Sequence, residues 1–147
     1  MHPDLKLISD ALEKLPIHLQ LLFALKCVED VASNLEDETA IDGMAKFRTL
    51  VTTPTADLNA QLHELANQLK SLASSHQGSK SIDGTRHAAV SATYALAKAV
   101  NQQPVDAAAY AAYSHVYGYG GYAVNDPDSF SEVHKRQLEH LKSLKVN

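Results

Sequence analysis

Apolar side chains recur at helical spacing along most of the chain. The clearest stripe lies between positions 58 and 72, where leucines stand three or four residues apart: Leu58, Leu62, Leu65, Leu69 and Leu72. Steps of three and four residues return to the same face of an α-helix, so these leucines predict one apolar helical face. No segment of useful length alternates apolar and polar residues as a half-buried β-strand does. The pattern therefore predicts an all-α fold.

Capping signals divide these stripes into about seven helices. Pro16 ends the first helix and can occupy the first position of the second, and Thr53 with Pro54 is expected to open the fourth. We expect Asp83 to cap the fifth helix and Asp126 the seventh. An aspartate suits these positions because its side chain accepts a hydrogen bond from an unpaired N–H group of the first helical turn.

A shorter third helix is expected after the acidic turn 36–38. Its apolar residues are Ile41, Met44, Phe47 and Val51, which step by three and four. We expect all four to lie on the inward face of this helix.

The polar stretch 74–84 contains two glycines and shows no helical period. It predicts a flexible loop. Neither flank is large enough to form a separate domain, so we expect residues 1–147 to form a single helical domain.

Two helices, expected at 83–101 and 104–122, carry stripes of small residues. The first stripe is Ala88, Ala92, Ala95 and Ala99, and the second is Ala107, Ala111, Ser114, Gly118 and Gly121. Small side chains let two helix backbones approach closely, and the connection between these helices is short. The two stripes therefore predict a closely packed antiparallel helix pair.

All six tyrosines lie between Tyr94 and Tyr122, in a chain without tryptophan. Tyr110, Tyr113 and Tyr117 are expected to flank the small-residue contact and fill its edges. Tyr119 and Tyr122 remain candidates for an exposed surface.

Composition excludes several classes of protein. The formal net charge of −4 argues against nucleic-acid binding, which needs a concentrated basic surface. A chain of 147 residues can bury roughly 70% of its unfolded surface, so it needs neither a metal nor a disulfide to fold. No apolar run approaches the roughly 20 residues of a membrane span, and the first residues lack the basic start of a signal peptide. We therefore expect a cytoplasmic, bacterial-style protein that binds neither membranes nor nucleic acid.

Six acidic residues stand out between Cys27 and Ala45, a segment that contains no lysine or arginine. They are Glu29, Asp30, Glu36, Asp37, Glu38 and Asp42. Such a run is usually a solvated turn with acids placed favourably at a helix N-terminus. The functional alternative is a docking surface for a basic protein partner, because complementary charge speeds association.

No catalytic or metal-binding constellation emerges from the sequence. The chain has eight histidines, but His134 and His140 are six residues apart and do not share a helical face. Cys27 stands beside an apolar stripe, where a buried and unreactive thiol is the usual state. We expect no catalytic residue, no metal and no cofactor. His87 and His115 could meet across the two alanine-rich helices, which would form a pocket together with Arg86 and Tyr117.

The segments LLFALKCVEDVASNLED, GTRHAAVSATYALAKAV and DAAAYAAYSHVYGYGGYA follow one another in a characteristic order. A helix with Cys-x-Glu and an acidic end precedes two alanine-rich helices, the second of which carries a histidine. From about Leu21 to Val124, this arrangement resembles the Imm-5-like family of bacterial immunity proteins. The resemblance implies a small α-helical protein that neutralises a toxin. The chain differs from the family in its Tyr/Gly-rich stretch 117–122 and in its additional C-terminal helix.

Three functional hypotheses follow. The leading one is a non-enzymatic helical protein that binds another protein, with the six acidic residues as the contact surface and a toxin as the partner that the family resemblance implies. The alternative is a helical enzyme that depends on a small ligand or a metal, with the pocket of Arg86, His87, His115 and Tyr117 beside the alanine- and glycine-rich layer. The third is a homo-oligomer in which the small-residue stripes of two chains meet.

Overall fold

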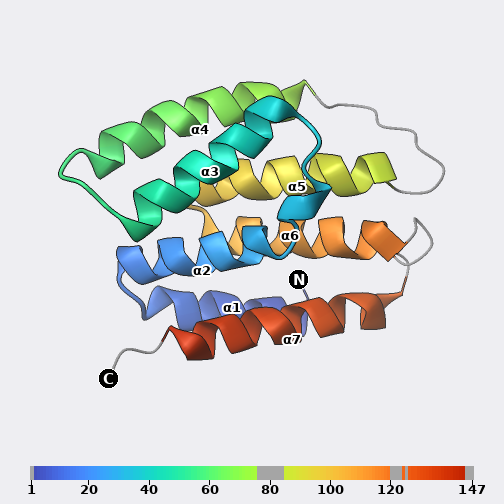
Figure 1. Ribbon diagram of the computed structural model, residues 1–147. Coiled ribbons are helices and arrows are strands. Elements are labelled where there is room, and N and C mark those ends of the chain that lie inside the picture. The colour runs from blue at the N-terminus through green and yellow to red at the C-terminus, as the bar shows by residue number, and fades with distance from the viewer. Residues whose placement is uncertain (1, 76–84, 120–123, 125, 145–147) are drawn as a thin grey trace.

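Helices build the whole of the described fold, as the apolar periodicity predicts. The computed structural model describes residues 2–75, 85–119, 124 and 126–144. Within these ranges it contains seven α-helices, one short 3-10 helix and no strand (Figure 1). The elements are α1 (Pro3–Glu13), α2 (Ile17–Glu29), η1 (Ala32–Asn34), α3 (Glu38–Thr52), α4 (Leu58–Ser74), α5 (Thr85–Val100), α6 (Pro104–Tyr119) and α7 (Pro127–Ser143).

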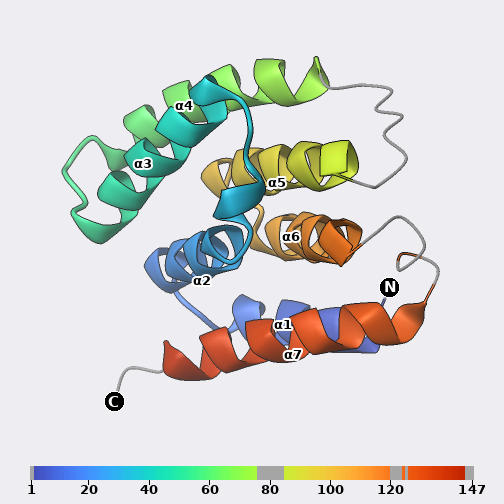
Figure 2. The same cartoon turned by 45° about the vertical axis from the view of Figure 1, so that its right-hand side comes forward.

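The helices form three groups in space (Figures 1 and 2). The pair α3–α4 lies on one side of the bundle and the pair α1–α7 on the opposite side. Between them lie α2, α5 and α6, and each of these three helices packs against both of the others. Phe23 of α2 and Phe47 of α3 are completely buried in the shared core. In the described ranges, no helix combines the length and the apolar character needed to cross a bilayer.

The antiparallel pair α5–α6 confirms the prediction made from the small-residue stripes. Ala92, Ala95 and Ala99 of α5 are completely buried, as is Ala107 of α6. The described helices end at Val100 and Tyr119, and the predicted extensions at 83–84 and 120–122 lie outside the described residues. Because these alanines are buried between α5 and α6 of one chain, they are not exposed for a contact between two chains.

Gly118 does not belong to this contact. A methyl group placed on its Cα would meet no atom within 4 Å, so its neighbours leave that position open. The prediction that Gly118 continues the packed stripe is therefore wrong, because the surface of α6 at this position faces solvent. Gly121 lies outside the described residues.

The polar residue in the stripe, Ser114, is buried and hydrogen bonded on both sides. Its hydroxyl donates to the carbonyl oxygen of Ala88 at 2.7 Å, which ties α6 to α5. The side-chain amide of Asn34 in η1 donates to the Ser114 hydroxyl at 3.0 Å. Burial of a hydroxyl without such partners would be costly, so this network explains how a serine fits among alanines.

Two predicted helix starts need correction. The second helix begins at Ile17, and Pro16 is its N-cap instead of its first residue. The fourth begins at Leu58 after its N-cap Asp57, not at Thr53 and Pro54, and Thr53 is instead the C-cap of α3. By contrast, Asp126 is the N-cap of α7 as predicted and accepts a hydrogen bond from the N–H of Asp128 at 3.0 Å. The predicted cap Asp83, with most of the predicted loop 74–84, lies outside the described residues.

The inward face of α3 also differs from the prediction at one position. Met44, Phe47 and Val51 are buried as expected, but Ile41 is 48% exposed. Ala40, which is completely buried, takes the inward position instead, and buried Gly43 lies against Leu69 of α4. A branched side chain is thereby left in solvent near the start of α3.

Candidate functional site

The six acidic residues of the sequence prediction fall into two groups. Two of them lie at the end of α2. Glu29 pairs with an arginine, and Asp30 pairs with a histidine that is cationic only when protonated. Glu29 Oε2 lies 3.2 Å from Nε of Arg48 in α3, and Asp30 Oδ2 lies 2.7 Å from Nε2 of His140 in α7. These two carboxylates therefore link neighbouring helices.

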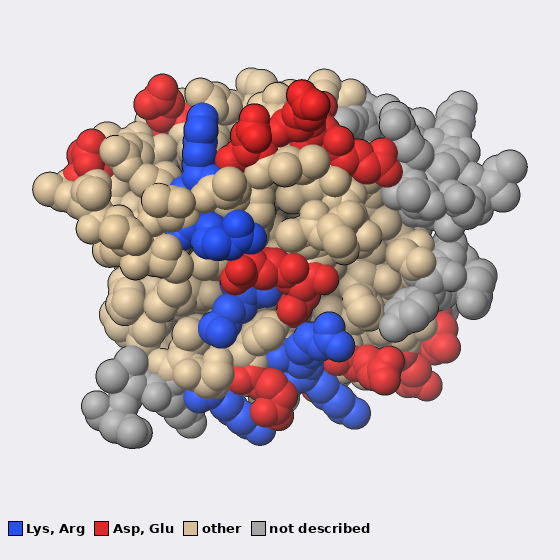
Figure 3. Space-filling view, viewed as in Figure 1, with Lys and Arg blue, Asp and Glu red and all other residues tan. Residues whose placement is uncertain are grey.

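The other four acidic residues gather around the beginning of α3 (Figure 3). Asp37 is the N-cap of α3 and accepts a hydrogen bond from the N–H of Thr39 at 2.8 Å. Glu36, Glu38 and Asp42 are exposed. Throughout the described part of the chain, none of these four carboxylates takes part in an ion pair. The beginning of α3 is thus an exposed surface of uncompensated negative charge.

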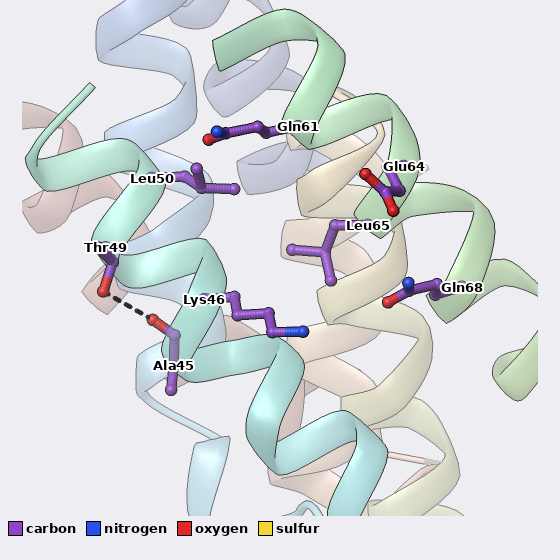
Figure 4. A pocket seen from close by; sticks show the side chains of 8 residues that line it. All are labelled: Ala45, Lys46, Thr49, Leu50, Gln61, Glu64, Leu65 and Gln68. Carbon is purple, nitrogen blue, oxygen red and sulfur yellow. Dashed lines mark hydrogen bonds between the residues drawn. The ribbon is translucent and has the colours of Figure 1, made fainter. Parts of the chain in front are cut away.

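A groove between α3 and α4 lies on the same side of the molecule. Its volume is about 480 Å³, and four residues from each helix line it (Figure 4). The lining residues are Ala45, Lys46, Thr49 and Leu50 from α3, and Gln61, Glu64, Leu65 and Gln68 from α4. Leu65 points from α4 toward α3, and Lys46 extends from α3 toward α4. Aliphatic side chains and the edges of long polar side chains therefore meet in one open groove.

The acidic surface and the groove are joined along α3. Ile41 stands between Glu38 and Asp42 in the sequence, and Ala45 follows it one helical turn later. Since residues four apart lie on the same side of a helix, exposed Ile41 continues the apolar lining of the groove toward the acidic surface. We call this combined region the α3 surface, comprising Glu36, Asp37, Glu38, Ile41, Asp42 and the groove.

The pocket predicted from Arg86, His87, His115 and Tyr117 is only partly assembled. The rings of His87 and Tyr117 stack across α5 and α6 with their centroids 4.9 Å apart. His115 lines a different pocket, because residues two apart on a helix project about 200° from one another. The side chain of Arg86 lies outside the described part of the structure. His87 and His115 therefore do not share a pocket in this fold.

The pocket that contains His115 lies between α2, α6 and α7 and has a volume of about 170 Å³. Asp30, Glu132 and Arg136 also line it. Burial, followed by the nearby positive charge of Arg136, lowers the pKa of His115 below its ordinary value. The imidazole is therefore held in its neutral form over a wider pH range than in a solvated histidine.

Cys27 lines this pocket and is completely buried. Burial raises the pKa of its thiol well above the ordinary value, and the negative charge of Asp30 adds to that shift. Because the thiolate is the reactive form of cysteine, this thiol is poorly suited to nucleophilic chemistry. In the ranges that the structure covers, no three His, Cys, Asp or Glu side chains come together as a metal site.

The groove between α3 and α4 was missed by the sequence analysis. A signal was present, since Ala45 and Leu50 are apolar residues of the third helix outside its inward stripe. Such residues become a site only where a second helix provides the opposite wall. Comparison of the chain with models of protein families, with curated proteins and with solved structures finds no match.

Proposed function

We propose that this chain is a non-enzymatic protein that acts by binding another protein through the α3 surface. One observation carries the proposal: exposed Ile41 lies among unpaired carboxylates and next to an apolar groove. Protein interfaces commonly combine an apolar centre with a polar rim, and this surface has both parts. Its negative charge favours a partner whose contact surface is basic, because complementary charge steers association.

The nature of the partner is proposed from the resemblance to the Imm-5-like family. In that family a small helical protein neutralises a bacterial toxin, so we propose a toxin with a basic surface as the partner. Of the acidic residues, Glu36, Glu38 and Asp42 are assigned to the interface. Glu29 and Asp30 are assigned to the structure of the chain, because both already hold partners in other helices.

The proposal is tested by capturing the partner from the cells that produce this chain and measuring its affinity for variants. The first variant reverses three charges of the α3 surface, Glu36→Lys, Glu38→Lys and Asp42→Lys. The matched control reverses three exposed acids on the opposite side of the bundle, Asp10→Lys, Glu13→Lys and Glu139→Lys. We expect the first variant to lose the partner and the control to retain it. Equal retention by both variants would contradict the assignment of the α3 surface.

A second variant separates loss of binding from loss of folding. Ile41→Gln changes an exposed side chain, so the unfolding temperature should change little, while the affinity for the partner should fall.

The proposed immunity function makes one more requirement of the captured partner. It should arrest growth when it is produced alone, and production of this chain in the same cells should restore growth. A partner that is harmless when produced alone would exclude the immunity function and leave protein binding intact.

A further inference from the structure

The pocket between α2, α6 and α7 lies apart from the α3 surface and has a different character. It is lined by residues of three helices that are distant in the sequence. Its volume of about 170 Å³ equals that of roughly five or six water molecules in the liquid, at about 30 Å³ each. This is below the range of about 300–1,000 Å³ that is usual for drug-sized ligands. Only a small molecule fits.

The buried residues that line the pocket, here called its floor, are mostly apolar and carry no charge. Cys27, Val31 and Ala111 are all buried, as is Val133. The one amide in the floor, Gln137, is already bonded on both sides: Nε2 donates to the carbonyl oxygen of Ala108 at 3.0 Å, and Oε1 lies 2.8 Å from Nδ1 of His134. The floor therefore offers van der Waals contact and no spare polar group from Gln137.

The exposed residues that line the pocket, here called its wall, carry opposite charges that form no ion pair with one another. Glu132 and Arg136 stand four residues apart on α7, a spacing at which an acid and a base often pair. Yet Arg136 lies in no ion pair and no hydrogen bond within the described residues, and the same is true of Glu132. Asp30 adds a second carboxylate, which holds His140 through Oδ2.

We propose that this pocket binds a small zwitterion that carries an ammonium group and a carboxylate a few bonds apart. Arg136 would bind the carboxylate, since a guanidinium presents parallel N–H donors to it. Glu132 and Asp30 would face the ammonium group. The short aliphatic part would lie on the floor beside Val133 and Ala111. An amino acid with a small side chain has this combination of charge, length and volume.

His115 completes the polar wall without adding charge. Burial and the positive charge of Arg136 lower its pKa, which favours the neutral imidazole near pH 7. Two of the residues that line the pocket, Asp30 and Glu132, are acidic, and one, Arg136, is a permanent cation. Charge balance alone thus favours the ammonium end of the ligand, and Arg136 selects for the carboxylate.

The test uses glycine, β-alanine and γ-aminobutyrate as probes, which differ in the distance between their charges. Acetate and methylammonium serve as probes with one charge each. Binding is followed by the amide NMR signals of the full chain. We expect at least one zwitterion to shift the signals of Asp30, His115 and Arg136 in a saturable manner. Each single-charge probe should bind more weakly by about tenfold or more, as expected when a charge-assisted hydrogen bond is lost.

Two variants connect the shifts to the pocket. Arg136→Gln keeps a good helix former at an exposed position and removes the positive charge, so the affinity for the zwitterion should fall by about tenfold or more. Lys135→Gln is the matched control, because Lys135 is an exposed neighbour on α7 that does not line the pocket. Three outcomes would overturn the inference: no saturable shift with any zwitterion, equal binding of the single-charge probes, or unchanged affinity of Arg136→Gln.

Discussion

His134 shows how the burial of one titratable side chain couples this fold to pH. The residue is 2% exposed, and the centroid of its ring lies 4.9 Å from that of the His2 ring. Because Gln137 Nε2 donates to Ala108, its Oε1 is the atom that accepts from His134 Nδ1. Burial is the main cause that lowers the pKa of His134. The hydrogen bond to Gln137 opposes this shift, and His2 adds to it.

A lowered pKa in the folded state makes the fold sensitive to acid. The unfolded chain takes up the proton near the ordinary histidine pKa of about 6.5, whereas folded His134 takes it up only at lower pH. Between these two values the unfolded state binds more protons, so the free energy of unfolding decreases as the pH falls. This contribution is fully present above about pH 6.5.

We therefore expect His134→Gln to flatten the pH dependence of stability just below pH 6.5. Urea unfolding at a series of pH values measures this slope, whatever the absolute stability of the variant. His63→Gln, which replaces an exposed histidine of α4, is the control and should keep the slope of the wild type. Part of the slope should remain in His134→Gln, because the pKa of His115 is lowered as well. An unchanged slope in His134→Gln would contradict this assignment.

Gly43 and Gly118 are the two described glycines that lie within helices, and they differ in the space around them. A methyl group on Gly118 meets nothing within 4 Å, whereas one on Gly43 would lie 3.0 Å from Cδ2 of Leu69. Leu69 is completely buried and has little room to move. We expect Gly118→Ala to raise the free energy of unfolding by up to about 1 kcal/mol, with a smaller gain if the end of α6 frays. Gly43→Ala should be less stable than Gly118→Ala, as thermal unfolding of both variants would show; the reverse order would contradict the packing of α3 against α4.

At the scale of elements, helix type could be predicted from the sequence better than helix limits. The leucine stripe of α4 is periodic over about four turns and the alanine stripe of α5 over about three, so burial selects one face of each helix. The start of α4 is decided locally among Thr53, Pro54 and Asp57, all of which are suitable residues for a helix start. The apolar stripe begins only at Leu58, and the helix begins there too.

Two aspartate N-caps allow this local chemistry to be tested. Asp37 accepts a hydrogen bond from the N–H of Thr39 in α3, whereas Asp57 accepts none from the backbone of α4. We expect Asp37→Ala to lower the free energy of unfolding by about 1 kcal/mol, the usual contribution of an N-cap. Asp57→Ala should lower it less, since its side chain makes no capping hydrogen bond to α4 and is bonded to the side chains of Thr55 and Gln61. Denaturant unfolding of the two variants compares them directly, and equal losses would argue against the capping contact at Asp37.

At the scale of the whole molecule, the sites could not be predicted because they form where helices meet. The acidic residues of the α3 surface were visible in the sequence, but their division into paired and unpaired groups depends on Arg48 and His140, which lie in other helices. The groove needs both α3 and α4. The 170 Å³ pocket needs three helices, one of which follows another by about a hundred residues. Periodicity identifies the inward face of each helix, but it does not say which other helices pack against that face.

The same scale explains why the α3 surface is available to a partner. The pair α3–α4 lies at one side of the bundle, with α5 beneath it and no further helix in the described ranges above it (Figure 2). A partner can therefore cover the groove and the beginning of α3 together without any rearrangement of the core. We propose that protein binding takes place there.

Hydrogen exchange of the chain, with and without its captured partner, tests this claim most directly. We expect the partner to slow amide exchange in α3 and in the part of α4 that lines the groove, while exchange in α1 and α7 stays as in the free chain. Protection confined to α1 and α7, with α3 and α4 unchanged, would contradict binding at the α3 surface.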